Sequence, residues 1–113
     1  MNIQAHDYVV VCMGTGTSYS AAVGCALLGT RRDGYTLEKL CTDPDVRGQG
    51  VATSIISCAQ GLVRGLQEKL TLHVDRGHRH DELVRFYSKR GFERVYTNDM
   101  ETCMMWQDKV QLY

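Results

Sequence analysis

The first third of the chain alternates between short apolar runs and polar stretches rich in Gly, Ser and Thr. Runs of this kind are typical of strands, and the stretches between them are typical of turns. Three strands are therefore predicted at residues 8–13, 19–28 and 35–42, separated by turns at 14–18 and 29–34. We expect them to form an antiparallel meander. In the third strand Leu37 and Cys41 should share one face, with Glu38 and Leu40 on the other.

From residue 51 the apolar positions recur at steps of three and four. This period predicts an amphipathic helix of about four turns that packs on the sheet. Residues 70–74 then alternate as a fourth strand. A short helix beginning at Asp81 or His80 and ended by Gly91 follows, and residues 92–97 and 103–107 are predicted to be two further strands.

The predicted order of elements defines the fold class. Three strands, a helix, a strand, a helix and two strands belong to the α+β class, with a mixed α/β sheet and a strand–helix–strand crossover at its centre. The length of 113 residues predicts a single domain, residues 1–113. Apolar residues make up 43% and charged residues 23%, which excludes a disordered or fibrous chain.

Charge and hydropathy limit the classes of partner that the protein is expected to bind. Basic and acidic residues number 13 each, so the formal net charge is zero. Proteins that bind a nucleic-acid backbone usually carry a basic excess, so nucleic-acid binding is disfavoured. The longest uncharged stretch, residues 8–30, is interrupted by glycines and predicts no membrane helix, and the first residues do not resemble a secretion signal. We expect a cytoplasmic protein with no membrane partner.

The cysteines and histidines do not predict a metal site. The five cysteines include no Cys-x-x-Cys pair, which disfavours a zinc ribbon or a thioredoxin-type site, and most lie in apolar runs typical of buried thiols. His73, His78 and His80 lie near two aspartates, Asp75 and Asp81, and a zinc site is the alternative interpretation there. A polar, histidine-containing loop is favoured, and no metal is predicted.

The segment 43–52, DPDVRGQGVA, carries the most specific chemistry. It joins a predicted strand to the start of the first predicted helix. A helix N-terminus presents unpaired N–H groups and a partial positive charge, both of which favour phosphate. Gly48 and Gly50 allow a ligand to approach the backbone closely. The spacing matches neither the Walker loop nor the Gly-x-Gly-x-x-Gly fingerprint.

Two motifs carry a family resemblance. Arg47, Gly50 and Ala52 match the pattern Arg/Gln-x-x-Gly-x-Gly/Ala, and residues 86–92, FYSKRGF, match a later Phe/Leu-Tyr-x-Lys-x-Gly-Phe signature. In this order and separation the chain resembles the GCN5-related N-acetyltransferases (GNAT) over roughly residues 23–106. The resemblance implies a GNAT-like acyl-CoA N-acyltransferase fold with a central, mostly antiparallel twisted sheet and a β-α-β-α core. The usual N-terminal helices are missing from the pattern, as in miniature relatives encoded by phages.

The resemblance also implies a cosubstrate, acetyl-CoA, and the residues that bind it. The backbone of Leu40, Cys41 and Thr42 would pair with the pantetheine arm. The pyrophosphate would lie on the loop and first helical turn, at Arg47, Gly48, Gln49, Gly50, Val51 and Ala52. Many relatives carry a cofactor-contacting Asn seven residues before the motif tyrosine, and His80 occupies that place here.

The same resemblance implies catalytic roles. Tyr87 occupies the family's usual position for a proton donor to the leaving thiolate. A primary ammonium, with an ordinary pKa of about 10.4, must lose a proton before it attacks. His73 stands where some relatives carry a carboxylate base, and imidazole suits proton transfer near neutral pH. Glu38, on the neighbouring strand, is the rival base, directly or through water.

The resemblance implies transfer of an acetyl group to a primary amine. Without the usual N-terminal helices the acceptor side would be open, which suits a protein lysine or N-terminus, or would be completed by a second subunit in a homodimer. Two alternatives remain: a small-molecule amine acetyltransferase, and a non-catalytic binding or inhibitor protein of the phage type that modulates a host factor. A phage-encoded protein would act in the host cytoplasm. Tyr87 favours an enzyme, because a pure binding protein needs no proton donor.

Overall fold

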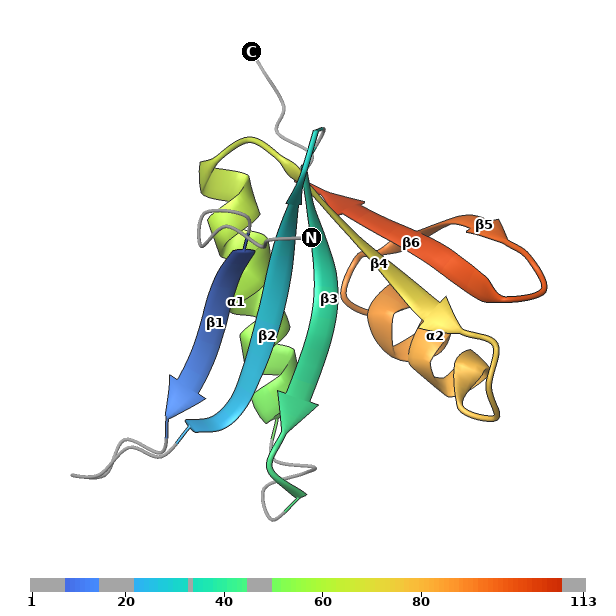
Figure 1. The fold of residues 1–113 in the computed structure, drawn as a ribbon, viewed down its shortest axis with the longest axis horizontal. Helices are drawn as coiled ribbons and strands as arrows, with labels where there is room; N and C mark the ends of the chain where they lie inside the picture. Colours follow the sequence, from blue (N-terminus) through green and yellow to red (C-terminus); the bar gives the residue numbers. More distant parts are fainter. Residues whose placement is uncertain (1–7, 15–21, 33, 45–49, 109–113) are drawn as a thin grey trace, which may run out of the picture.

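Six strands form one mixed sheet in the computed structural model, in the order β1-β2-β3-β4-β6-β5 (Figure 1). The structure describes residues 8–14, 22–32, 34–44 and 50–108. The elements are β1 (Tyr8–Gly14), β2 (Ala22–Arg31), β3 (Gly34–Thr42), α1 (Val51–Gly65), β4 (Lys69–Asp75), α2 (His80–Ser88), β5 (Glu93–Thr97) and β6 (Glu101–Gln107). The predicted order and mixed sheet are confirmed. Within the described segments no helix is long and apolar enough to cross a membrane.

The sheet divides at its centre. Every neighbouring pair is antiparallel except β3 and β4, which run parallel on either side of the α1 crossover. Their pairing begins at Gly34 with Lys69 and ends at Leu37 with Leu72. Beyond that point β3 remains paired with β2 and β4 remains paired with β6. The two strands therefore diverge, which is visible in Figure 1.

A β-bulge coincides with this divergence. Leu28 pairs with Leu37 and Leu27 pairs with Lys39, so Glu38 is an extra residue in β3. A bulge bends the strand and reverses the facing of the residues beyond it. Leu37 and Leu40 consequently both pack against the core, and the predicted grouping of Leu37 with Cys41 on one face is wrong.

Both helices contribute to one hydrophobic core. The apolar positions of α1 and of α2 pack in a single cluster with alternate residues of the strands; its fully buried members include Leu28, Ile55, Val63, Leu70 and Met104. Figure 1 shows α1 covering one face of β1, β2 and β3. The apolar residues at steps of three and four predicted which face of α1 is buried, because burying that apolar face drives the packing of the helix on the sheet.

Arg90 joins the two helices. Its Nη1 donates to the carbonyl oxygen of Phe86 at 2.6 Å, and its Nη2 donates to Thr53 Oγ1 of α1 at 2.6 Å. Its guanidinium carbon also lies 3.7 Å from the centre of the Phe86 ring. Gln60 of α1 donates in turn to the Arg90 carbonyl at 2.8 Å. The end of α2 is thereby fixed against the first turns of α1.

Two further predictions need correction. The strand predicted at residues 19–28 continues to Arg31, which pairs with Gly34, so the turn between β2 and β3 is shorter than predicted. Residues 19–21 lie outside the described part. The cysteines are not uniformly buried: Cys103 is, but Cys41 and Cys58 are exposed. Cys41 follows the bulge on the outer face, and Cys58 lies outside the buried stripe of α1.

Candidate active site

A groove of about 1060 Å³ opens where β3 and β4 diverge. Most of the residues predicted for the site line it: Glu38, Leu40, Cys41, Thr42, Gly50, Val51, Ala52, His73 and Tyr87. They come from β3, the start of α1, β4 and α2. The bulge and the end of the parallel pairing therefore bring together residues that are far apart in the sequence. Arg47, Gly48 and Gln49 lie outside the described residues.

The N-terminus of α1 forms one end of the groove. Gly50 has a left-handed φ of 79°, and the first helical hydrogen bond runs from the N–H of Ser54 to its carbonyl at 3.0 Å. The N–H groups of Val51, Ala52 and Thr53 thus precede the helical ladder. All three residues line the groove, no described side chain caps them, and the first turn holds no acidic residue. This end is suited to an anion.

Gly50 leaves room at this helix end. A Cβ added there would meet no atom of the described structure within 4 Å. The backbone therefore faces open space, in the conformation that glycine adopts most readily.

The edge of β3 forms the floor of the groove. Residues 39–42 pair with β2 on one side only, because the pairing with β4 ends at Leu37. In an antiparallel pair alternate residues turn their N–H and C=O groups away from the partner strand. Those groups face the groove and can pair with an extended ligand as an added strand would.

Tyr87 reaches the groove from the helix side of the sheet. Its side chain is 9% exposed and belongs to the core cluster, with Phe86 and Phe92 rings in edge contact at 5.2 and 5.6 Å between centroids. Its hydroxyl has no hydrogen-bond partner among the described residues. Burial raises the pKa of this phenol, opposed by the charge of Arg90. The hydroxyl is therefore protonated at neutral pH and available as a donor.

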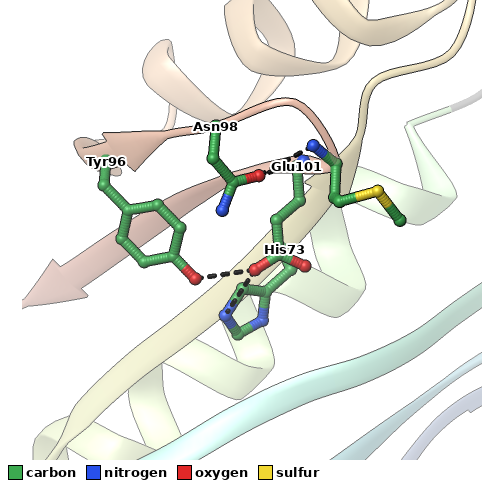
Figure 2. Close-up of polar contacts among 5 residues, drawn as sticks. His73, Tyr96, Asn98 and Glu101 are labelled. Carbon is green, nitrogen blue, oxygen red and sulfur yellow. Dashed lines mark hydrogen bonds and ion pairs between the residues drawn. The ribbon is translucent and has the colours of Figure 1, made fainter.

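His73 reaches the same groove from the opposite face. It is exposed, whereas its neighbours Leu72 and Val74 are buried against the helices, as the alternation predicted. Its Nε2 lies 3.7 Å from Glu101 Oε2 on β6 (Figure 2). A protonated phenol and an imidazole thus flank the gap between β3 and β4 from its two sides.

Glu38 lines the groove at the bulge, but its carboxylate is already engaged. It forms an ion pair and hydrogen bond with Arg31 at the end of β2. One oxygen of the Glu38 carboxylate is thus already taken by a guanidinium N–H. Of the two candidate bases, the geometry favours His73.

His80 does not line the groove. Its side chain is 6% exposed, Nδ1 lies 2.8 Å from Asp81 Oδ1, and Nε2 lies 2.6 Å from the Thr102 hydroxyl. The hydrogen bond from His80 lowers the pKa of the Asp81 carboxyl. With both ring nitrogens occupied, His80 connects α2 to β6, and its contact with a cofactor stays a prediction.

Several groove residues were not predicted. Thr53, Leu83 and Phe86 lie on the same elements as the motifs. Only Leu83, four residues before Tyr87, was signalled by helical spacing. Glu101 had no such signal, because only the pairing of β4 with β6 brings it near His73. Among the described residues no group of three His, Cys, Asp or Glu side chains is arranged to hold a metal ion.

Comparison with known proteins decides the family. Residues 5–94 match a family model described as an acetyltransferase (GNAT) domain. The chain belongs to this family. No curated protein matches the sequence of this GNAT domain, so its nearest comparisons are solved structures.

Three solved structures illustrate the shared fold. The ribosomal-protein-S18-alanine N-acetyltransferase of Escherichia coli has a TM-score of 0.75 at 18% identity, covering 97% of this chain and 77% of that enzyme. The PaiA N-acetyltransferase of Thermoplasma acidophilum, in complex with coenzyme A, has a TM-score of 0.71 at 18% identity, covering 88% and 61%. An acetyltransferase of Bacillus cereus has a TM-score of 0.70 at 12% identity, covering 93% and 79%. The predicted GNAT-like fold is confirmed.

Proposed function

We propose that this GNAT domain is an acetyl-CoA-dependent N-acetyltransferase acting on a primary amine. One observation carries the proposal: a single groove joins an uncapped helix N-terminus to a gap flanked by Tyr87 and His73. The first feature suits the phosphates of coenzyme A and the second suits acid–base chemistry. The coenzyme A complex of the PaiA enzyme adds support from the same fold.

The cosubstrate would lie along the groove. Its pyrophosphate would accept hydrogen bonds from the N–H groups of Val51, Ala52 and Thr53, with the predicted contributions of Arg47, Gly48 and Gln49. The pantetheine arm would run along the free edge of β3 at Leu40, Cys41 and Thr42. The groove volume of about 1060 Å³ exceeds that of most pockets for small metabolites and suits a ligand of this length.

The reaction would occur in the gap between the strands. The ammonium loses a proton to His73 and the free amine nitrogen attacks the thioester carbonyl. The nitrogen of the tetrahedral adduct loses its second proton to solvent as the carbon–sulfur bond breaks and the amide forms. A backbone N–H on the edge of β3 would stabilise the developing oxyanion. The leaving thiolate takes the proton of the Tyr87 hydroxyl, which is regenerated from water. Acid and base act from opposite faces and do not compete for one position.

The acceptor we propose is a lysine or N-terminus of a protein. Among the described residues, only β1 and β2 precede β3, and no helix covers the outer side of the gap. An uncovered gap admits a protruding chain end or side chain. The E. coli neighbour, by its name, acetylates an alanine of a ribosomal protein. A small amine remains the alternative acceptor. A second subunit that covers the acceptor side of the gap remains the alternative to an open gap.

The experiment for the activity supplies acetyl-CoA labelled in the acetyl group. The acceptors are a peptide with a free N-terminus and no lysine, an N-blocked peptide with one lysine, and a small diamine. Label in either peptide supports the proposal, and the two peptides separate its two acceptors. Label in the diamine alone would identify a small-molecule enzyme. No transfer despite tight cofactor binding would favour a binding protein.

Cysteine alkylation locates the cofactor independently of activity. Cys41 and Cys58 are both exposed, but only Cys41 lines the groove. Desulfo-coenzyme A has no thiol, so it does not consume iodoacetamide. At about ten times its Kd it should slow alkylation of Cys41 roughly ten-fold, measured by mass spectrometry of peptides, and leave Cys58 unchanged. Equal rates at Cys41 with and without the analogue would remove the groove as the cofactor site.

A further inference from the structure

Three polar side chains meet beside the groove on the face where His73 is exposed. The Tyr96 hydroxyl donates to Glu101 Oε2 at 2.6 Å, and the same oxygen lies 3.7 Å from His73 Nε2 (Figure 2). In the register of β4 and β6, His73 pairs with Cys103 and Asp75 pairs with Glu101. His73 and Glu101 therefore project from the same face as diagonal neighbours, within reach of long side chains.

The hairpin between β5 and β6 fixes the backbone of Glu101. Asn98 Oδ1 accepts hydrogen bonds from the N–H groups of Met100 at 2.8 Å and of Glu101 at 2.9 Å (Figure 2). The Asn98 N–H donates to the Glu101 carbonyl at 2.9 Å. An Asn side chain used in this way makes the turn rigid. The Glu101 carboxylate thus extends from a defined position rather than from a free loop.

Tyr96 fixes the carboxylate itself. Its hydrogen bond to Glu101 raises the pKa of Tyr96 to about 12. The phenol therefore remains a donor throughout the neutral range. A donated O–H stabilises the charged form of the carboxylate that accepts it. Oε2 of Glu101 thus lies between the Tyr96 hydroxyl and the imidazole.

We infer that Glu101 is a positioning residue for His73 and orients its ring through Nε2. The inference rests on the proposed function, in which His73 is the base. At 3.7 Å the contact with a neutral ring is longer than a hydrogen bond. The contact strengthens when Nδ1, the ring nitrogen that Glu101 does not contact, takes the proton of the ammonium. The proton then leaves from Nδ1 to solvent, and the Glu101 carboxylate stays ionised throughout.

Other titratable groups surround His73 but do not take this role. On β3, Glu38 is bound to Arg31, and Lys39 lines the groove. Arg79 and Glu82, beside and on α2, bind each other. The remaining groups are Tyr87 on α2, Asp75 on β4, His78 in the loop that follows, and Cys103 on β6. Among the described residues Glu101 alone forms an ion pair with the His73 ring.

The first test follows His73 by NMR, without cosubstrate. The imidazole carbon-bound proton signals are recorded against pH, and the His73 signal is assigned by its loss in His73→Gln. Glu101→Gln keeps the size of the side chain and an acceptor for Tyr96. It should change the midpoint of these signals against pH, because the ring loses its charged partner. Asp99→Asn, which removes one charge from the same hairpin, should move it by less than half as much.

The second test measures kcat/KM against pH with acetyl-CoA and whichever peptide acceptor is turned over, because this quantity reports the groups of the free enzyme. In Glu101→Gln the ascending limb should move as the NMR midpoint does, and the plateau should fall several-fold because the ring is no longer held in place. Asp99→Asn should leave the ascending limb of the pH–rate profile as it is in the wild type.

The outcomes separate the two proposals. An NMR midpoint that is the same in wild type and Glu101→Gln, or equally shifted in Asp99→Asn, overturns the role of Glu101. A midpoint that shifts while the kinetic limb does not also overturns it. If Glu101→Gln shifts the NMR midpoint but the wild-type protein transfers no acetyl group to any acceptor, the coupling is confirmed and the proposed function fails.

Discussion

Tyr87 and Tyr96 both hold their protons more tightly than a free tyrosine, for different reasons. Burial raises the pKa of Tyr87, whereas a hydrogen bond to the Glu101 carboxylate raises that of Tyr96. Only the first hydroxyl lines the groove and lacks a partner among the described residues. The same chemical group is therefore prepared as a proton donor to substrate in one place and as a support for a carboxylate in the other.

Replacing Tyr87 by Phe should separate turnover from binding. The ring contacts with Phe86 and Phe92 are kept and only the unpartnered hydroxyl is removed, so folding should be preserved. Loss of a positioned proton donor should lower kcat by about 10²–10⁴-fold, with cofactor affinity within a factor of about two. The matched control is Tyr35→Phe, a tyrosine that packs against the core outside the groove. Equal turnover in the two variants would reduce Tyr87 to a packing residue.

At the scale of single residues, the sequence predicted some features of the site and missed others. Alternation placed His73 opposite the buried Leu72 and Val74, because a strand with one buried face leaves a period of two. The bulge at Glu38 has no such signature, so the faces of Leu37 and Leu40 were assigned incorrectly. Glu101 was missed because its position beside His73 is set by strand pairing rather than by any local pattern.

At the scale of the elements, α1 connects core packing to ligand binding. Its buried stripe holds the helix on β1, β2 and β3, and its uncapped first turn consequently faces the groove. The helix was predictable from the spacing of its apolar residues. The divergence of β3 from β4 was not, because it depends on where parallel pairing stops after Leu37.

Gly50→Glu should abolish cofactor binding while preserving the fold. A Cβ at this position meets no described atom within 4 Å, although the left-handed backbone costs about 1–2 kcal/mol for a non-glycine residue. A negative charge at the helix N-terminus should repel the pyrophosphate by about 4 kcal/mol, so coenzyme A binding should fall about 10³-fold and no longer be detected by calorimetry. Gly61→Glu is the control, because it adds the same charge at an exposed, open position within α1. Similar losses in both variants would contradict a phosphate site at the helix end.

The junction of α2 with β6 should contribute to stability through Thr102. The Thr97 hydroxyl lies 2.9 Å from Thr102 Oγ1, which lies 2.6 Å from His80 Nε2. Thr102→Val would leave a buried imidazole nitrogen unpaired and should lower the free energy of unfolding by about 1–3 kcal/mol in urea titrations. Thr97→Val removes only the outer, more exposed bond and should lower it by less. If Thr102→Val left the free energy of unfolding unchanged, His80 would have to find another hydrogen-bond partner.

At the scale of the whole molecule, the sheet is divided but the core is continuous. Parallel pairing joins its two parts only from Gly34 to Leu37, where the backbones approach so closely that a Cβ on Gly34 would lie 2.6 Å from the Lys69 carbonyl oxygen. The helices compensate for this narrow seam: one hydrophobic cluster contains residues of both, and Arg90 links them. The divergence can therefore hold a ligand without separating the fold into two units.

The last prediction is that residues 1–113 unfold as one domain and that coenzyme A stabilises it as a whole. A core shared by both parts of the sheet should give a single unfolding transition. Its enthalpy measured directly by calorimetry should equal the van't Hoff enthalpy. A ligand bound only by the folded state, at about 100 times its Kd, adds about 2.7 kcal/mol of stability. For a domain of this size 1 kcal/mol corresponds to roughly 4 °C in Tm, so a rise of about 10 °C is expected. Gly50→Glu should show the single transition but no shift, whereas two transitions, one unaffected by coenzyme A, would show that the parts fold separately.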